Sequence, residues 1–399
     1  MAASRRTLVR AMPAYLDHAA TSPLRPQARD ALLAHLGATG NPASLHGAGR
    51  DARRVLEESR ESVAESLGCR PSEVVFTSGG TESDNLAIKG AYRARRAGDP
   101  ARRRVLVSAV EHHAVLHAAA WLEQREDARV ELLPVDAEGR VLPDALEAAL
   151  AGDDVAVVSV MWANNETGVL QPVERLAALC RAHGVPFHTD AVQAVGAVPV
   201  SFAESGVDLL TATAHKVGGP HGVGVLLVRR GIQVAPLLHG GGQERDLRSG
   251  TVGVPAIAGL AAAYEIAVKE QAAAALRLEA LRDRLVEGVR DLVPGVVVHG
   301  GGADRLPGIA NLGFGGCEGD SLLMLLDAQG VEVSTGSACS AGVPQPSHVL
   351  LAMGIDEQEA REALRVSLGH SSTEADVDAF LAAIGPAVER AGAARRVRR

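Results

Sequence analysis

The stretch that decides the fold is residues 185–228, VPFHTDAVQAVGAVPVSFAESGVDLLTATAHKVGGPHGVGVLLV. It contains three short runs rich in apolar residues, at 185–189, 208–213 and 223–228. Runs of this length and composition predict strands that are buried on both faces of a sheet. Polar side chains follow the first two runs, and ligands of open α/β sheets bind beyond the carboxyl ends of strands. The stretch therefore predicts a functional site as well as a fold.

The same pattern extends toward the N-terminus, where apolar runs alternate with helical stretches such as 172–183. Pro172 suits the first turn of that helix and Gly184 suits its end. This alternation predicts a doubly wound, mainly parallel α/β sheet. The additional predicted strands are residues 74–76, 105–108, 130–134 and 155–161.

A second, smaller unit is predicted after the sheet. A long helical stretch rich in Ala, Leu, Arg and Glu runs from Val254 to about residue 289, and shorter mixed elements follow it. At 399 residues the chain exceeds the size of a single hydrophobic core. We expect a large domain over 26–260, a small α+β domain over 261–399, and an N-terminal segment, 1–25, that packs with the small domain.

Composition excludes several classes of protein. Hydrophobic residues make up 47% and charged residues 22%, as in soluble enzymes, and the chain lacks an apolar stretch of about 18 residues that could cross a membrane. The formal net charge of -8 argues against nucleic-acid binding through a global positive field. Residues 1–12 lack the apolar core of a secretory signal, although an organellar transit peptide stays open. Four cysteines without a C-x-x-C pair favour a reducing cytoplasm over a disulfide framework or a metal site.

Polar residues follow several predicted strands, and each has an ordinary explanation when it is taken alone. The glycine turn at 77–85 could simply reverse the chain, His112 could be a core histidine, Asp190 and Asn165 could cap helices, and Lys216 could be a solvated turn lysine. These separate explanations do not account for the expected convergence of all these residues on one edge of the sheet. A pyridoxal-phosphate (PLP) enzyme needs a lysine, a carboxylate for the pyridine nitrogen, a flat group over the ring and a phosphate cup.

The lysine that would attach the cofactor can be identified almost by elimination. The chain has three lysines, of which Lys89 falls in the middle of a predicted helix and Lys269 lies in an exposed-looking stretch. Lys216 alone ends a predicted strand.

These residues resemble a known family, the class V aminotransferase-like PLP enzymes of fold type I, and within it the bacterial housekeeping cysteine desulfurases. The resemblance covers nearly the whole chain. The matching motifs are YLDHAAT (15–21), GNPAS (40–44), TSGGTESDNLA (77–87), NNE (164–166), HTDA (188–191), AHK (214–216), GGGQER (240–245), RSGT (248–251), GSACS (336–340) and LRVSLG (364–369).

The resemblance implies roles for the cofactor-binding residues. It makes Lys216 the Schiff-base lysine and Asp190 the partner of the pyridine nitrogen. It stacks His112 over the ring and places Gln193 and Asn165 near the ring hydroxyl and the substrate. The phosphate is expected to be held by Gly80, Thr81, Thr213 and His215. A fifth residue, Thr251 of the partner subunit, is expected to reach it across the interface of a homodimer.

The substrate implied by the resemblance is L-cysteine, whose carboxylate Arg365 clamps with Asn41 close by. Cys339 then takes the sulfur as a persulfide, alanine is released, and an acceptor such as an iron–sulfur scaffold or a tRNA-thiolation enzyme receives the sulfur. Apart from Cys339, residues 334–342 are all Ser, Thr, Gly or Ala, which predicts a mobile loop around Cys339 and fits a buried structural cysteine poorly. Cys180 is expected in the core, and Cys317 receives no role.

Two rival functions stay open. The first is another PLP activity on the same scaffold, such as a selenocysteine lyase or an ordinary aminotransferase, which has no use for Cys339. The second is a catalytically silent scaffold for sulfur-transfer assembly, which could dispense with Lys216.

Overall fold

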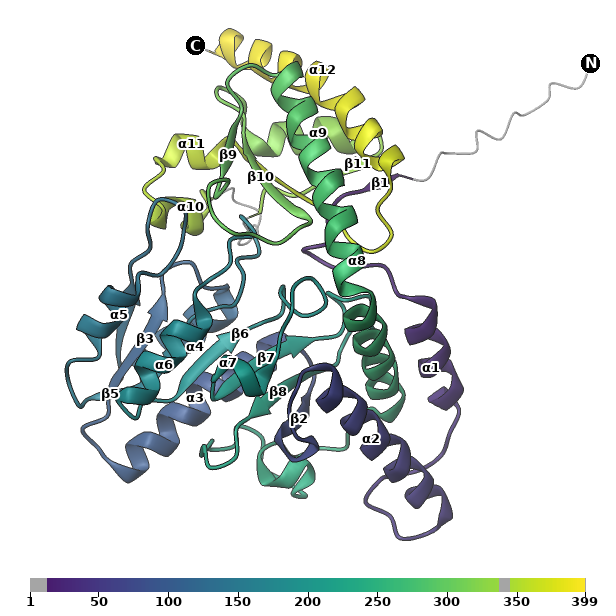
Figure 1. Ribbon diagram of the computed structural model, residues 1–399, viewed down its shortest axis with the longest axis vertical. Helices are drawn as coiled ribbons and strands as arrows, with labels where there is room; N and C mark the ends of the chain where they lie inside the picture. The colour runs from purple at the N-terminus through teal and green to yellow at the C-terminus, as the bar shows by residue number, and fades with distance from the viewer. Residues whose placement is uncertain (1–12, 337–344, 399) are drawn as a thin grey trace, which may run out of the picture.

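The computed structural model describes residues 13–336 and 345–398, and its main feature is a seven-stranded sheet of order β2-β8-β7-β6-β5-β3-β4 (Figure 1). Strands β3 to β7 run parallel to one another, whereas β8 runs antiparallel to both β7 and β2. The strands are β2 (Val74–Thr77), β3 (Arg104–Ser108), β4 (Arg129–Leu133), β5 (Val155–Ser159), β6 (Phe187–Asp190), β7 (Leu209–Thr213) and β8 (Gly224–Val228).

All seven predicted strands are present, and the doubly wound α/β class is confirmed. Strand β4 differs from the other strands of the sheet, because it is buried only at Leu133 and not along its length. Both β2 and β4 lie at edges of the sheet, but β2 is buried along its whole length, so the edge position alone does not explain the exposure of β4. The helices of this part are α1 (Pro26–Leu36), α2 (Gly47–Ser66), α3 (Gly80–Gly98), α4 (His113–Arg125), α5 (Pro143–Ala149), α6 (Val173–Ala182) and α7 (Phe202–Ser205), with short 3-10 turns at Pro71–Glu73 and Gln243–Asp246.

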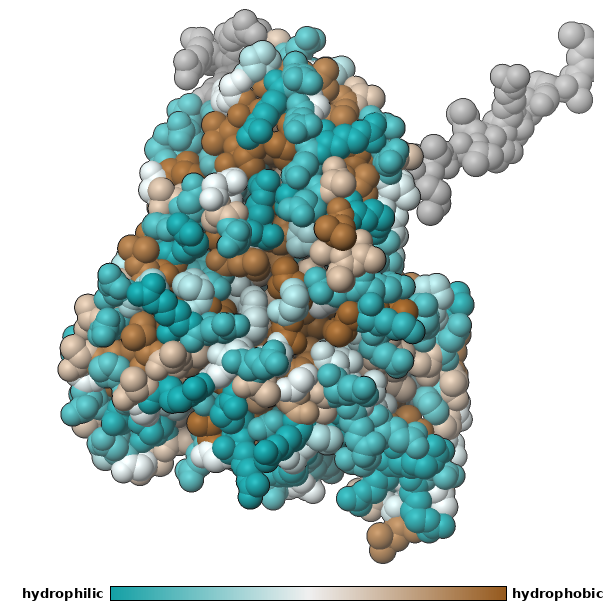
Figure 2. All heavy atoms as spheres, viewed as in Figure 1, coloured by the Kyte–Doolittle hydropathy of each residue, from teal (hydrophilic) through white to brown (hydrophobic). Residues whose placement is uncertain are grey.

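A second sheet forms the other part of the molecule. Its order is β12-β10-β9 with antiparallel neighbours, and a two-stranded parallel pair, β1-β11, lies beside it. Figure 2 shows hydrophobic side chains gathered over the part where this sheet lies, and Val297 of β9 is among the exposed ones. The elements are β1 (Ala14–Tyr15), β9 (Val297–His299), β10 (Ile309–Gly313), β11 (Val331–Glu332), β12 (Ala363–Ser367), α9 (Gly319–Asp327), α10 (His348–Ala352), α11 (Glu357–Arg361) and α12 (Glu374–Arg398).

Helix α8 (Val254–Leu292) runs along both parts (Figure 1). Its first half, including Tyr264, packs into the core of the seven-stranded sheet, and its second half, including Leu285, packs into the core around β10 and β12. Ala14 and Leu16 also belong to the second core. The predicted domain boundaries stay predictions. None of the helices in the described ranges is long and apolar enough to cross a membrane.

Candidate active site

A cavity of about 480 Å³ lies at the carboxyl ends of β5, β6 and β7, where the second part of the molecule faces the large sheet. Ten of the predicted site residues line it, together with buried groups that the sequence did not single out. The ten are Gly80, Thr81, His112, Asn165, Asp190, Gln193, Thr213, His215, Lys216 and Arg365.

Lys216 follows β7 and reaches into this cavity. Its Nζ donates to the carbonyl oxygens of Ala19 at 2.6 Å and Ala20 at 2.7 Å. Burial, helped by the positive charge of Arg365, lowers the pKa of Lys216 to about 8. A lysine whose amine is partly neutral near neutral pH can act as a nucleophile or a base.

Asp190 ends β6 and is buried, with only 6% of its surface exposed. Its Oδ1 accepts a hydrogen bond from the backbone N–H of Val192 at 2.8 Å. Burial raises the pKa of Asp190 to about 6, although the charge of Lys216 opposes the shift. A buried carboxylate of this kind favours a cationic partner in the cavity, such as a protonated ring nitrogen.

The start of α3, at the end of β2, forms a cradle that suits an anion. The helix begins at Gly80, and the preceding Gly79 has a φ of 151°, which only glycine adopts readily. A Cβ on Gly80 would lie 3.1 Å from Val192 Cγ2, so a side chain there would fill the cradle. The first N–H groups of a helix and its dipole attract a phosphate, which fits this position.

His112 is the N-cap of α4, and its Nδ1 accepts from the N–H of Ala114 at 3.2 Å. Desolvation and the charge of Lys216 lower the pKa of His112 to about 4. The imidazole is therefore neutral at physiological pH and presents a flat, uncharged ring to the cavity.

Arg365 lies on β12 and approaches the cavity from the second sheet. Its Nη1 donates to the carbonyl oxygen of Asn165 at 3.0 Å, and its Nη2 donates to Asp17 Oδ1 at 2.7 Å. Its Nε is buried and has no hydrogen-bond partner among the described residues. The guanidinium fork thus has unused capacity for a carboxylate.

Two predicted residues lie elsewhere within the single chain. Asn41 and Thr251 both line a separate cavity of about 330 Å³, together with Arg60 and Glu244. Their predicted roles stay predictions. Cys339 lies outside the described residues, but Gly336, three residues before it, lines the main cavity.

Three carboxyl groups at the site have no role in the sequence-based prediction. Asp84 and Glu111 are buried, and burial, together with the nearby charge of Asp190, raises the pKa of both carboxyls. Asp17 pairs with Arg365. Asp84 and Asp17 stand inside motifs quoted above, but neither spacing nor periodicity distinguishes a buried carboxyl from a solvated one.

The arrangement fits pyridoxal phosphate. The cavity combines an amine of lowered pKa, a buried carboxylate, a neutral flat ring and a helix start that a phosphate could occupy. Groups of these kinds could attach the cofactor, keep its ring protonated, cover it and hold its phosphate.

Comparisons with known proteins agree with this chemistry. Residues 14–380 match the family model described as aminotransferase class-V. An IscS-like cysteine desulfurase of Mycobacterium tuberculosis is 56% identical over 382 residues, which are 95% of this chain and 97% of the relative. A cysteine desulfurase of Cereibacter sphaeroides is 46% identical over 94% of this chain and 96% of its own length.

The fold has close counterparts among solved structures. One described as a NifS-like protein superposes with a TM-score of 0.87 at 37% identity, covering 95% of this chain and all of the other. A NifS-like protein from Rickettsia africae gives a TM-score of 0.85 at 30% identity, over 95% of this chain and 99% of the other. The chain therefore belongs to the class V aminotransferase family of PLP enzymes and, within that family, to the cysteine desulfurases.

Proposed function

We propose that the protein converts L-cysteine to L-alanine and passes the sulfur, as a persulfide on Cys339, to an acceptor protein in the cytoplasm. The observation that carries the proposal is the meeting of Lys216, Asp190 and Arg365 in one cavity that Gly336 also lines. Gly336 is the last described residue before Cys339, and it lies at the edge of this cavity. An aminotransferase that uses a keto acid has no need of a cysteine at that position.

The proposed cofactor is pyridoxal phosphate, which supplies an electron sink for negative charge at the substrate α-carbon when it is bound. Lys216 would attach it, Asp190 would keep its ring nitrogen protonated, and His112 would cover the ring. Gln193 and Asn165 would lie near the ring hydroxyl and the substrate. The phosphate would be held by Gly80, Thr81, Thr213 and His215.

The chain's own residues would perform the remaining steps. Arg365 binds the substrate carboxylate, and the neutral amine of Lys216 takes the α-proton at Nζ, which its lowered pKa permits. The Cys339 thiolate attacks the substrate sulfur, so that an S–S bond forms while the C–S bond breaks. The electron pair of the broken bond stays with the carbon skeleton, which takes up protons and leaves as alanine.

Peptide mapping after borohydride reduction tests the site assignment. We expect the reduced cofactor on Lys216 and none in Lys216→Ala, whereas the matched variant Lys89→Ala keeps the label because Lys89 lies on α3 beside Trp121. A label on Lys89 or Lys269 would contradict the assignment.

We also propose a homodimer in which Thr251 of the partner subunit completes the phosphate cup. The support is that Thr251 lies outside the cavity of its own chain. Hybrid dimers of a Thr251-defective and a Lys216-defective chain contain one intact site if the sites are shared. We therefore expect the mixture to regain activity that neither parent has. Unshared sites predict no gain, because each site then lacks one of the two residues.

A further inference from the structure

Residues 17–20 contact both basic side chains of the active-site cavity. Asp17 Oδ1 accepts from Arg365 Nη2 at 2.7 Å, while the carbonyls of Ala19 and Ala20 accept from Lys216 Nζ at 2.6 and 2.7 Å. The Ala19 carbonyl also accepts from Gln193 Nε2 at 2.8 Å. A tetrapeptide thus connects the residue proposed to bind the substrate carboxylate with the residue proposed to move the proton.

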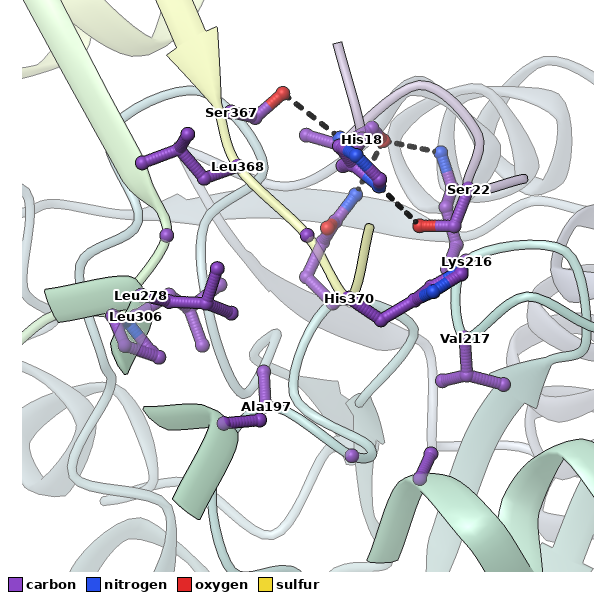
Figure 3. Close-up of a pocket in the computed structure, with 18 of the residues that line it drawn as sticks. His18, Ser22, Ala197, Lys216, Val217, Leu278, Leu306, Ser367, Leu368 and His370 are labelled. Carbon is purple, nitrogen blue, oxygen red and sulfur yellow. Dashed lines mark hydrogen bonds between the residues drawn. The ribbon is translucent and has the colours of Figure 1, made fainter. Parts of the chain in front are cut away.

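The tetrapeptide separates two cavities. On one side lies the active-site cavity, which Ala19 and Ala20 line, and Lys216 lines both cavities. On the other lies a smaller cavity of about 90 Å³, lined by His18, Ser22 and Ala19 among others. Figure 3 shows His18 and Ser22 at this smaller cavity, between Ser367 of β12 and Lys216. The segment therefore borders open space, and a shift into it would break the hydrogen bonds that the N–H groups of His18 and Ala19 donate to Ser367.

Asp17 accepts a hydrogen bond from Nη2 of Arg365, the nitrogen that takes part in both bidentate binding modes of a guanidinium. A guanidinium binds a carboxylate bidentately through Nη1 and Nη2 or through Nε and Nη2, so Nη2 belongs to both edges. An incoming carboxylate must take Nη2 from Asp17 or lie next to the Asp17 carboxylate. The second arrangement brings like charges together around a side chain that is only 5% exposed, where screening by water is weak.

We propose that Asp17 is a latch on Arg365 that the substrate carboxylate displaces, and that this displacement loosens the peptide that holds the free amine of Lys216. In the absence of substrate the latch neutralises and orients Arg365. When a carboxylate takes its place, residues 17–20 shift toward the smaller cavity, so that they no longer hold the Lys216 amine once the substrate has freed it from the cofactor. Asp17 is thus a positioning residue that couples carboxylate recognition to the readiness of the base. The inference rests on the proposed roles of Arg365 and Lys216.

Binding of propionate, which has a carboxylate but no amine or thiol, tests the latch in the cofactor-loaded protein. We expect Asp17→Asn to bind propionate at least threefold more tightly than wild type by calorimetry and as a competitive inhibitor. The KM for L-cysteine should fall by a similar factor, while kcat does not rise because the coupling to Lys216 is lost. Asp17→Glu keeps the charge and should restore wild-type affinity.

The controls separate the latch from a general effect. Asp30→Asn removes an exposed carboxylate on α1 that pairs with Arg29, and it should change neither constant. 1-Propanol, which lacks the carboxylate, should gain no affinity in Asp17→Asn.

Unchanged or weaker propionate binding in Asp17→Asn would overturn the proposal. So would the failure of both Asp17→Asn and Asp17→Ala to keep the circular dichroism spectrum and cofactor colour of wild type, because Asp17 would then be a structural residue. If instead Arg365→Lys leaves propionate binding unchanged, the proposed role of Arg365 is wrong, which is a different failure.

Discussion

Asp190→Asn should make the cofactor-free protein more stable at the expense of its function. Burial raises the pKa of Asp190 from 3.8 to about 6. Because a tenfold change in a protonation constant corresponds to about 1.4 kcal/mol, keeping this carboxylate ionised costs the folded state about 3 kcal/mol above pH 6. The asparagine Oδ1 can still accept from the N–H of Val192, so the substitution removes the charge and keeps that hydrogen bond.

The sign of the pH dependence follows from the raised pKa. Below pH 3.8 the carboxyl is protonated in both the folded and the unfolded state, and the cost is absent. Between pH 3.8 and pH 6 the cost grows, and above pH 6 it is present in full. The variant should therefore gain up to about 3 kcal/mol at pH 8 and almost nothing near pH 4.

Guanidinium unfolding followed by tryptophan fluorescence measures this difference. The chain has two tryptophans, Trp121 on α4 and Trp162 just after β5, so the signal reports on the part that holds Asp190. A destabilised variant at pH 8, or a gain that is equal at pH 4 and pH 8, would refute the reasoning. The same variant should bind PLP weakly, because the ring nitrogen loses its anionic partner.

Two further predictions concern a buried ion pair outside the active-site cavity and Lys216 inside it. Glu244→Ala should lower the free energy of unfolding by about 3–5 kcal/mol, because Glu244 and Arg60 form a buried pair at 2.8 Å and the substitution leaves the Arg60 charge unpaired. As a control in the same unfolding assay, removing the exposed Glu58, which pairs with Arg54, should cost less than about 1 kcal/mol. The rate at which cofactor-free protein rebinds PLP should rise about tenfold between pH 7 and pH 9 and then level off, because the pKa of Lys216 is about 8. A rate that still climbs tenfold per pH unit above pH 9 would contradict that pKa.

Much of the fold follows from local pattern. The runs around Val157 and Leu210 are continuous and apolar because these strands are covered on both faces, and such runs need little context to be recognised. The position of the cavity follows as well, since parallel strands end at one edge and their next residues meet there. The exposure of β4 could not be predicted in this way, because it depends on which other segments cover an edge strand: β2, at the opposite edge, is buried throughout.

Contacts between residues that are far apart in the sequence could not be predicted from local patterns. Asp17 and Arg365 are 348 positions apart, and no periodicity connects them. Asp84 and Glu111 are carboxyls in buried positions, which sequence patterns assign to the surface. Asn41 and Thr251 line another cavity of their own chain, and the role proposed for Thr251 depends on a second subunit, which the sequence of one chain cannot place.

The controls for sulfur transfer come from the other cysteines. Cys180 lies in the core as predicted, and burial raises the pKa of its thiol far above the ordinary value. Cys69 is likewise shielded, with its pKa raised to about 12 by burial. Neither can supply a thiolate near neutral pH. Substituting either by serine should leave turnover of L-cysteine largely intact.

Cys339→Ser tests the central claim most directly, with alanine formation and the mass of the peptide around position 339 as the measured quantities. The variant should bind PLP and change colour with L-cysteine, because Lys216, Asp190 and Arg365 are untouched. It should form almost no alanine and carry no added sulfur atom, since a serine hydroxyl stays protonated at neutral pH and is a poor nucleophile toward sulfur. Alanine formation at the wild-type rate, or a persulfide on Cys317 in place of Cys339, would contradict the account.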